Sequence, residues 1–346
     1  MTGTLRDFSK PVMDLNGKSV LVTGGTGSFG KAITRYILER FAVRRLVVFS
    51  RDELKQFEME RSLPVAKHPA LRYFIGDVRD QGRLTSAMRG IDYVIHAAAM
   101  KQVPTAEYNP FECIRTNVIG AENVVQAAME AGVQKVLALS TDKAANPINL
   151  YGASKLASDK IFVAANNVSG FGGTRFAVVR YGNVIGSRGS VVELFGTLLR
   201  EGAREIPITD PRMTRFWITL NQGVGFVLSS MEMMQGGELF VPKIPSMRIA
   251  DLAASMAPGL PHRAIGIRPG EKLHEVLISE DDARLTLELD DRFIVQPAFP
   301  FWRAEPYQRS GAHPVPEGFS YTSDRNTEWL SAEALQQLIA LGTPGA

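Results

Sequence analysis

The sequence predicts an α/β fold, with a doubly wound parallel sheet and a smaller mixed lobe in the second half of the chain. Short apolar runs of strand length alternate with longer segments of helical periodicity in the first half. A glycine-rich turn joins the first predicted strand to the first predicted helix. Polar and small residues follow the strand ends, where open α/β sheets bind their ligands.

The composition is typical of a globular protein of one large domain or two. The chain has 346 residues, of which 45% are hydrophobic and 22% charged. A net charge of +3 is too small to indicate a nucleic-acid partner. The single cysteine, Cys113, excludes an intramolecular disulfide and suits a reducing compartment. No apolar run reaches the roughly 18–20 residues that span a bilayer, and residues 1–14 do not resemble a signal peptide, so we expect a cytoplasmic protein without a membrane partner.

The first strand is predicted at residues 18–23, followed by a glycine turn and a helix that extends to residue 40. Gly24 permits the turn, Gly27 lets the backbone approach a pyrophosphate, and Gly30 allows close helix–strand packing. The free N–H groups at the helix start would face the phosphates. The spacing G-x-x-G-x-x-G resembles that of extended short-chain dehydrogenases/reductases, which implies a Rossmann-like domain. The predicted cofactor-binding residues of this turn are Gly24, Thr26, Gly27, Ser28, Phe29 and Gly30.

The end of the second strand, predicted at residues 45–49, favours NADP over NAD. NAD enzymes usually place a carboxylate here for the ribose 2′-hydroxyl, whereas NADP enzymes place an arginine near the 2′-phosphate. Ser50 and Arg51 occupy this position, and Lys55 lies one helical turn further on. Asp52 leaves the choice open, since it could instead cap the next helix.

Three more strands are predicted at residues 71–75, 91–96 and 135–140, with helices at 81–89 and 109–131 between them. Small residues after the fourth strand would let a flat ring approach the backbone, although plain packing would account for them as well. Asp80 is equally plausible as the cap of the helix that follows it. The resemblance implies further cofactor contacts from Asp77, Val78, Ala97, Ala98, Ala99, Lys101 and Asn117.

Tyr151 and Lys155 are the first pair of predicted catalytic residues. They lie one turn apart on a predicted helix, hence on one face. An ammonium beside a phenol favours the phenolate and lowers its pKa, so Tyr151 could take a hydroxyl proton while a hydride leaves the same carbon for the cofactor. Both residues would also contact the cofactor, and Ser140 or Thr141 occupies the place of the family's supporting hydroxyl. This spacing is a weak signal alone and gains weight from its place after the fifth strand.

Asp142 and Lys143 are not needed by simple reductases or epimerases. Elimination of water from a sugar requires a base for the C5 proton and an acid for the departing C6 hydroxyl. This pair, together with the segments 50–55, 98–103 and 149–155, closely resembles UDP-N-acetylglucosamine 4,6-dehydratases of the inverting type. The resemblance extends from about residue 15 to about residue 338.

The resemblance implies an NADP-dependent hydro-lyase that acts on a UDP-sugar and forms homo-oligomers. The sugar would be oxidised at C4, lose water across C5–C6 and recover the hydride at C6, with inversion at C5. The product would be UDP-2-acetamido-2,6-dideoxy-beta-L-arabino-hex-4-ulose, in the first step of pseudaminic acid or related surface-sugar synthesis. Asp142 would be the acid and Lys143 the base, which requires the pKa of Lys143 to fall through burial or through nearby charge from Lys101 and the nicotinamide. A solvated loop pair is the alternative interpretation of Asp142 and Lys143.

The second half of the chain supplies the predicted substrate contacts. A strand at residues 174–180 ends in a turn, the helix 191–200 could receive a diphosphate at its start, and the loop 265–275 resembles the family's uridine-diphosphate contact. Residues 271–277 could instead form a helix with a solvated polar face. The predicted substrate-binding residues are Lys101, Asn183, Arg188, Val191, Thr209, Met213, Arg215, Arg268 and Glu271.

The expected organisation is an N-terminal extension (1–14), an NADP-binding Rossmann domain (15–186) to which later parts return, a substrate-binding lobe (187–296), and a C-terminal strap with a short helix (297–346). His274 has no neighbouring His or Cys in the sequence, so no metal site is predicted. Two other functions remain open. A UDP-sugar 4-epimerase would use Tyr151 and Lys155 with NAD and leave Asp142 and Lys143 idle. A non-catalytic NADP-sensing protein would need none of these groups.

Overall fold

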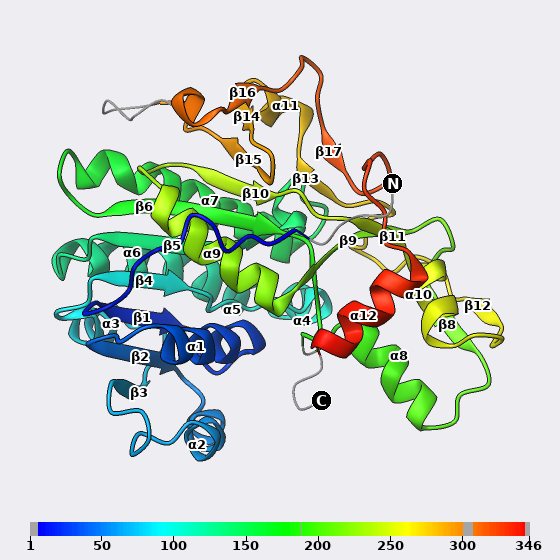
Figure 1. Ribbon diagram of the computed structural model, residues 1–346, viewed down its shortest axis with the longest axis horizontal. Coiled ribbons are helices and arrows are strands. Elements are labelled where there is room, and N and C mark those ends of the chain that lie inside the picture. The colour runs from blue at the N-terminus through cyan, green and yellow to red at the C-terminus, as the bar shows by residue number, and fades with distance from the viewer. Residues whose placement is uncertain (1–5, 188, 300–306, 343–346) are drawn as a thin grey trace.

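A long, mostly parallel sheet runs through the molecule (Figure 1). The computed structural model describes residues 6–187, 189–299 and 307–342. In this part of the chain the main sheet has 10 strands. The parallel strands, in sheet order, are β3 (Leu71–Ile75), β2 (Arg45–Ser50), β1 (Ser19–Thr23), β4 (Tyr93–His96), β5 (Lys135–Thr141), β6 (Arg175–Tyr181) and β10 (Leu239–Pro242). The antiparallel strands β15 (Arg292–Val295), β14 (Thr286–Glu288) and β16 (His313–Pro314) complete it. The predicted α/β fold class is confirmed.

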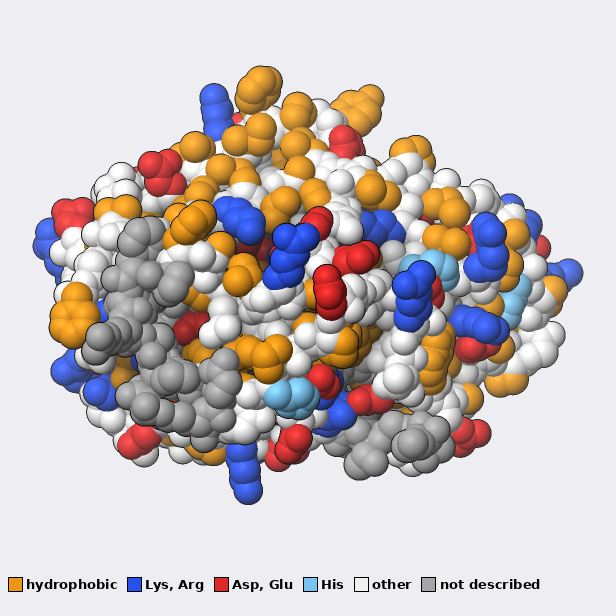
Figure 2. All heavy atoms as spheres, turned by 90° about the horizontal axis from the view of Figure 1, so that it is seen from above, with side chains coloured by type: hydrophobic (Ala, Val, Ile, Leu, Met, Phe, Trp, Pro, Cys, Tyr) orange, Lys and Arg blue, Asp and Glu red, His pale blue; other side chains and the backbone are white. Residues whose placement is uncertain are grey.

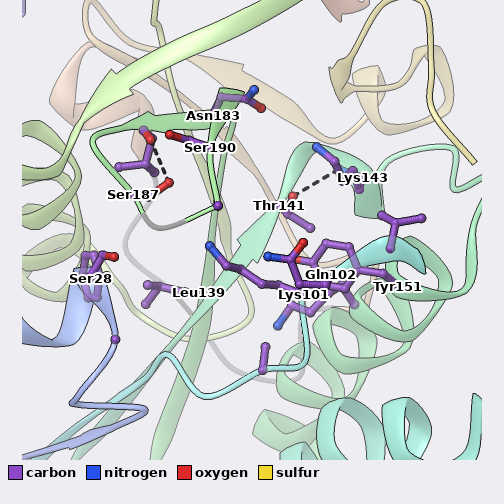
Figure 3. A pocket seen from close by; sticks show the side chains of 18 of the residues that line it. Ser28, Lys101, Gln102, Leu139, Thr141, Lys143, Tyr151, Asn183, Ser187 and Ser190 are labelled. Atoms are coloured by element: carbon purple, nitrogen blue, oxygen red, sulfur yellow. Dashed lines mark hydrogen bonds between the residues drawn. The ribbon is translucent and has the colours of Figure 1, made fainter. Parts of the chain in front are cut away.

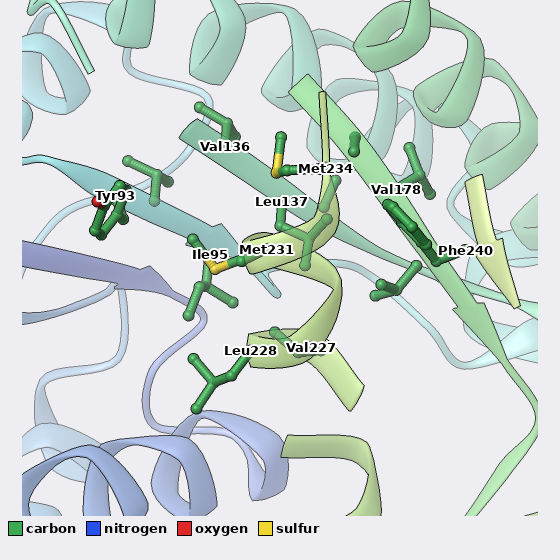
Figure 4. Packing of buried hydrophobic residues seen from close by; sticks show 14 of the residues in the cluster. Tyr93, Ile95, Val136, Leu137, Val178, Val227, Leu228, Met231, Met234 and Phe240 are labelled. Carbon is green, nitrogen blue, oxygen red and sulfur yellow. The ribbon is translucent and has the colours of Figure 1, made fainter. Parts of the chain in front are cut away.

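Helices cover both faces of this sheet. On one face α1 (Ser28–Arg40) packs beside α9 (Leu220–Met233), and on the other α3 (Gln81–Met88), α6 (Gly120–Glu130) and α7 (Leu150–Ser169) lie side by side (Figure 1). The strands are buried on both faces and therefore consist of nearly continuous apolar runs. Figure 4 shows Leu228 and Met231 of α9 against Ile95 and Leu137 of the sheet. The helix α2 (Glu53–Ser62) follows β2.

The helix predicted at residues 109–131 is interrupted in the structure. The chain forms α4 (Val103–Tyr108), α5 (Pro110–Ile114) and a π-helical segment, η1 (Arg115–Ile119), before α6. Pro110 begins α5, where its missing N–H costs no hydrogen bond, and Asn109 leaves the helical conformation before it. The π-helical segment carries Asn117, whose side chain is buried and bonded to the loop after β4.

The chain reverses its direction of travel across the sheet at β1. From β1 it proceeds to β2 and β3 on one side, and then returns to place β4 on the other side of β1. Such a reversal opens a crevice at the carboxyl ends of the strands, because the connections leave in opposite directions. The smaller lobe faces these ends (Figure 1).

The smaller lobe has its own hydrophobic cluster, which includes Trp217, Leu252 and Leu335. Its strands are β7 (Asn183–Ile185), β9 (Thr214–Thr219) and β11 (Ser246–Arg248) in one sheet, and β8 (Ile206–Ile208) with β12 (His262–Ala264) in another. Its helices are α8 (Val191–Arg200), α10 (Ile249–Met256) and α12 (Ala332–Gly342). The remaining elements are η2 (Asp142–Ala144), β13 (Val276–Ile278), α11 (Glu280–Ala283), η3 (Tyr307–Ser310) and β17 (Tyr321–Thr322).

Residues 6–14, part of the predicted N-terminal extension, pack along α9. Phe8 is buried edge-on against Phe226, with ring centroids 5.4 Å apart. Ser229 donates to the carbonyl of Lys10 at 2.8 Å. The predicted extension 1–14 and strap 297–346 include residues 1–5, 300–306 and 343–346, which lie outside the described residues.

No helix in the described ranges is long and apolar enough to cross a bilayer. The same residues contain no group of His, Cys, Asp and Glu side chains arranged to hold a metal ion. On the face shown in Figure 2, acidic and basic side chains alternate among apolar ones, and neither sign of charge forms a continuous patch.

Candidate active site

A cavity of about 920 Å³ lies at the carboxyl ends of the parallel strands, between the sheet and the smaller lobe. Thr141, Lys143 and Tyr151 lie together on one side of it, with Ser28 on the opposite side (Figure 3). The volume of this cavity is at the upper end of the usual range for ligand sites. Among the described residues, the predicted cofactor-binding residues that line it are Gly24, Thr26, Gly27, Ser28, Phe29, Gly30, Ser50, Arg51, Lys55, Asp77, Val78, Ala97, Ala98, Ala99, Lys101, Tyr151 and Lys155.

The glycine turn after β1 has the geometry of a phosphate cradle. Gly24 has φ of +64°, and a Cβ there would lie 2.8 Å from the backbone of Ala98. A Cβ on Gly30 would lie 2.5 Å from Gly25, so this position also excludes a side chain. The start of α1 has no side-chain cap and no acidic residue in its first turn. Its N–H groups can therefore bind the pyrophosphate of a dinucleotide, which fits this turn.

The end of β2 presents cations toward the cavity. Asp52 caps α2, where its Oδ1 accepts from the backbone N–H of Lys55 at 3.0 Å and its Oδ2 pairs with Lys55 Nζ at 2.6 Å. The side chain of Arg51 is 65% exposed and only loosely paired, at 3.8 Å, with Asp77. Asp52 is thus engaged in its cap, and the arginine remains accessible.

Asn117 does not line the cavity. Its Oδ1 accepts from Met100 N at 2.8 Å, and its Nδ2 donates to Met100 O and to Ser154 Oγ, each at 2.9 Å. The side chain therefore fixes the loop after β4 to α7. Burial lowers the pKa of His96 at the end of β4 to about 3, with a smaller contribution from Lys155, so the imidazole is neutral where it bonds Thr23.

The helix α7 carries Tyr151 and Lys155 into the cavity. Asn149 caps the helix by accepting from Gly152 N at 2.7 Å. Burial raises the pKa of Tyr151 to about 12, and Lys143 and the Thr141 side chain act to lower it. Burial lowers the pKa of Lys155, while Asp159 opposes that effect. Burial therefore outweighs the effects of Lys143 and Thr141 on the pKa of the phenol.

The ammonium of Lys143 lies between two buried carboxylates. Its Nζ is 3.1 Å from Asp142 Oδ1 and 3.4 Å from Glu275 Oε1. Burial lowers the pKa of Lys143, but Asp142 and Glu275 outweigh burial, and the pKa lies above that of an ordinary lysine although Arg215 acts to lower it. Lys143 is therefore an ammonium here, in contrast to the neutral base that the elimination requires.

Asp142 is only 1% exposed and does not line the cavity, whereas Lys143 does. Its Oδ1 accepts from Thr141 Oγ1 at 2.8 Å. Its Oδ2 is buried and has no hydrogen-bond partner among the described residues. Asp142, the predicted acid, is therefore separated from the cavity by Lys143 and Thr141, which both line it.

Glu275 is a residue that sequence reasoning missed. The helix considered for residues 271–277 does not form: Glu275 directly precedes the strand β13, with its side chain 2% exposed and on the cavity wall. Its Oε1 is 3.5 Å from Arg215 Nε. A lone carboxylate directly before the apolar run 276–278 was the one local sign of a buried acid.

A second buried ion pair supports the catalytic helix from the side of the sheet. Asp159 Oδ2 accepts from Ser140 Oγ at 2.8 Å and pairs with Arg180 Nη2 at 3.2 Å. Neither Asp159 nor Arg180 was singled out from the sequence. They keep the end of β5 in register with α7 and so hold Thr141 near Tyr151.

The predicted substrate residues lie on the lobe side of the same cavity. Arg215 is buried, and its guanidinium donates to the carbonyls of Thr214, Leu273 and Lys272. Arg268 is more exposed, and its guanidinium lies 3.8 Å from Glu271. Arg188 lies outside the described residues. The other predicted substrate residues that line the cavity are Lys101, Asn183, Val191, Thr209, Met213, Arg268 and Glu271.

The loop 265–275 is fastened to the catalytic segment. Asn149 Nδ2 donates to Gly270 O at 2.8 Å, and Lys272 Nζ donates to Ala145 O. The segment that would bind the nucleotide and the segment that carries the acid–base groups therefore form one hydrogen-bonded unit.

Gly152→Ala is expected to destabilise this unit. A Cβ on Gly152 would lie 2.2 Å from the carbonyl oxygen of Lys143, so η2 and α7 would have to separate. We expect the free energy of unfolding to fall by about 1–3 kcal/mol, measured by urea unfolding, and turnover to fall with it. Gly223→Ala in α9 is the matched control, because its Cβ would meet nothing within 4 Å, and it should stabilise the helix. An unchanged Gly152→Ala protein would contradict the predicted clash.

The arrangement combines two kinds of chemistry in one cavity. A phenol with an adjacent lysine can move a hydroxyl proton while a nicotinamide exchanges a hydride. The Asp142–Lys143–Glu275 group beside it can move a second proton and release a leaving hydroxyl. Oxidation followed by elimination needs both.

The sequence matches a family model described as "Polysaccharide biosynthesis protein" over residues 20–297. A protein of Campylobacter jejuni named UDP-N-acetylglucosamine 4,6-dehydratase (inverting) is 58% identical over 329 residues, or 94% of this chain and 98% of that one. A Rickettsia canadensis protein named UDP-glucose 4-epimerase is 41% identical, over 93% of this chain and 95% of that one.

Two solved structures share the fold. Pen from Bacillus thuringiensis is 38% identical and superposes with a TM-score of 0.86, over 95% of this chain and 99% of that one. DesIV, a dTDP-glucose 4,6-dehydratase from Streptomyces venezuelae determined with NAD and TYD bound, is 25% identical with a TM-score of 0.63, over 74% of this chain and 86% of that one.

Proposed function

The chain belongs to the polysaccharide biosynthesis protein family, and from this premise we propose that it is a UDP-N-acetylglucosamine 4,6-dehydratase of the inverting type, a hydro-lyase. The observation that carries the proposal is the position of Lys143. Its ammonium lies on the wall of the cavity with Tyr151 and within 3.4 Å of two carboxylates. An epimerase has no use for a second acid–base group beside its tyrosine.

The proposed reaction removes two protons from the sugar, one from the C4 hydroxyl and one from C5, and a different side chain accepts each. Tyr151 takes the proton of the sugar's C4 hydroxyl, with Thr141 and Lys143 beside it to stabilise the phenolate. A nicotinamide cofactor held by the glycine turn after β1 would supply the redox chemistry, the transfer of a hydride from C4 to C6. Lys143 removes the C5 proton, which the new C4 ketone has made acidic. Asp142 does not line the cavity, so it supplies the proton for the departing C6 hydroxyl by way of Thr141 Oγ1, which is hydrogen-bonded to Asp142 and does line the cavity.

The nicotinamide cofactor that we propose is NADP. The turn after β1 fits a dinucleotide pyrophosphate, and a dehydratase of the same fold was determined with NAD bound. Two features of this chain favour the phosphorylated form. Arg51 is exposed at the ribose end of the cavity, and Asp52 is occupied in capping α2.

Arg51→Ala is expected to weaken NADP binding about tenfold and to leave NAD binding nearly unchanged, because only NADP has a 2′-phosphate for the guanidinium. Calorimetric titration of the cofactor-free protein with each dinucleotide measures this difference. Arg284→Ala, which removes an exposed arginine away from the cavity, is the matched control. An equal loss of affinity for both dinucleotides would contradict the assignment.

Incubation with UDP-N-acetylglucosamine in deuterated water tests the proposed function. A dehydratase gives a 4-keto-6-deoxy sugar with solvent deuterium at C5, since the C5 proton exchanges through Lys143. An epimerase gives the galacto isomer without deuterium, and a non-catalytic sensor gives no product. Either of the last two results overturns the proposal.

The proposed enzyme is a homo-oligomer. Tyr108 and Phe111, at the junction of α4 and α5, are 91% and 73% exposed, which is unusual for large apolar side chains. A second subunit that covered them would remove this apolar area from water. Light scattering after size-exclusion chromatography measures the oligomeric state. A monomer at micromolar concentration would refute the proposed homo-oligomer.

A further inference from the structure

The proposed reaction lacks an acceptor for the proton that Lys143 carries as an ammonium. The elimination requires Lys143 to lose a proton, yet it lies as an ammonium between two carboxylates. It also requires Asp142 to hold a proton of its own for the departing hydroxyl. A third group must therefore accept the proton of Lys143.

Glu275 has the geometry of that third group. Its Oε1 is 3.4 Å from Lys143 Nζ, it lines the cavity, and its side chain is 2% exposed. Its Oε2 is buried and has no hydrogen-bond partner among the described residues. This oxygen therefore has a free acceptor position beside Lys143.

The surroundings keep the carboxylate of Glu275 in place. Arg215 Nε lies 3.5 Å from it, and the backbone N–H of Glu275 donates to Ser323 Oγ at 2.9 Å. The guanidinium of Arg215 is itself held by hydrogen bonds to protein carbonyls, which fixes its position beside Glu275. The titratable and charged groups that face the Lys143–Glu275 pair are Asp142 on η2, Tyr151 on α7, Arg215 on β9, Lys272 on the loop 265–275 and Lys101 on the loop after β4.

We propose that Glu275 is a positioning residue that accepts the proton of Lys143, so that the neutral amine can remove the C5 hydrogen of the sugar. An N–H bond of Lys143 breaks and an O–H bond forms on Glu275, which leaves an amine and a carboxylic acid. The inference rests on the proposed function, because it assigns a step within that reaction.

The protons balance over one turnover. Lys143 gains the C5 proton, and Asp142 loses one to the C6 hydroxyl, which departs as water. C5 regains a proton from the Lys143–Glu275 pair when the hydride returns to C6. The proton that Tyr151 took from the C4 hydroxyl replaces the one that Asp142 lost, and no external oxidant or reductant is consumed.

The pH dependence of the elimination distinguishes this role from a structural one. Transfer within the Lys143–Glu275 pair changes no net proton count, so its extent does not depend on pH while the pair holds one shared proton. Without Glu275, the amine forms only by loss of a proton to solvent. The fraction of neutral amine then rises about tenfold per pH unit below its pKa.

The test compares wild type with Glu275→Gln in single turnovers of UDP-N-acetylglucosamine by the holoenzyme. The absorbance of reduced nicotinamide rises with C4 oxidation and decays with elimination and hydride return. We expect the rise to persist in Glu275→Gln and the decay to slow about tenfold or more near neutral pH, with recovery as the pH increases. The wild-type decay should change little between about pH 6.5 and pH 8.5. Glu275→Asp should restore part of the rate, and the exposed Glu317→Gln is the matched control.

A decay in Glu275→Gln that equals wild type, or that is slowed equally at every pH, overturns the proposal. The first result would make Asp142 the acceptor, and the second would leave Glu275 a structural role. Failure of wild type to make the 4-keto-6-deoxy product would instead count against the proposed function.

Discussion

Tyr151→Phe is expected to lower kcat by about 10²–10⁴-fold, with neither a rise nor a decay of reduced nicotinamide in a single turnover. The substitution removes the oxygen that takes the C4 hydroxyl proton, and without that step no later step can begin. The ring remains buried against Ala106 and Cys113, so the fold and cofactor binding should be preserved. A Tyr151→Phe enzyme that still formed reduced nicotinamide at the wild-type rate would show that another group takes this proton.

The same tyrosine makes C4 oxidation dependent on pH. Burial raises the pKa of Tyr151 to about 12, Lys143 and Thr141 lower it, and the positive charge of the oxidised nicotinamide would lower it further. The reactive form is the phenolate, and its fraction increases as the pH approaches that pKa from below. The rise phase should therefore accelerate from neutral to alkaline pH, and Thr141→Val should shift this acceleration to higher pH.

Lys143→Ala is expected to separate the two halves of the reaction. C4 oxidation should slow, because Lys143 no longer lowers the pKa of Tyr151, but the phenol and the cofactor turn remain and reduced nicotinamide should still appear. Elimination should fall by about 10²–10⁴-fold, because no base remains for the C5 proton, and the reduced signal should persist without decay. Deuterium at C5 of the recovered sugar should be absent, as measured by mass spectrometry.

The exposed Lys67→Ala is the matched control for the loss of a lysine. Asp142 and Glu275 lose their shared cation in Lys143→Ala, and Glu275 keeps only Arg215 at 3.5 Å, so a lower melting temperature is expected. Titration of the variant with cofactor shows whether the active site is still folded, and so distinguishes a loss of stability from a loss of catalysis. A Lys143→Ala protein that bound cofactor and retained full dehydratase turnover would refute the role assigned to the lysine.

The parts of the site that could be predicted from the sequence are those encoded by short spacings. The turn from Gly24 to Gly30 needs glycine because a Cβ would meet backbone there, and such a requirement is local enough to leave a recognisable pattern. Tyr151 and Lys155 lie one turn apart on a single helix. The alternation of strands and helices likewise determined the parallel sheet.

What could not be predicted depends on contacts between distant segments. Glu275 reaches Lys143 only because β13 joins the lobe to the end of β5, and no local pattern distinguishes it from a solvated glutamate. The protonation state of Lys143 follows from that contact. The inward turn of Asn117 likewise depends on a π-helical segment that the amphipathic period of residues 109–131 does not show.

The predicted dinucleotide and sugar sites lie in one cavity, but the two ligands need not leave it equally often. The hydride that leaves the sugar comes back to the same molecule, so each cycle ends with the dinucleotide in its starting state. The glycine-turn end of the cavity need not open between cycles, whereas the end formed by the loop 265–275 must open for every sugar. Because Asn149 and Lys272 fasten that loop to the catalytic segment, opening it disturbs the α7 cap and the backbone beside Lys143. We therefore expect the proposed reaction to release few half-converted sugars.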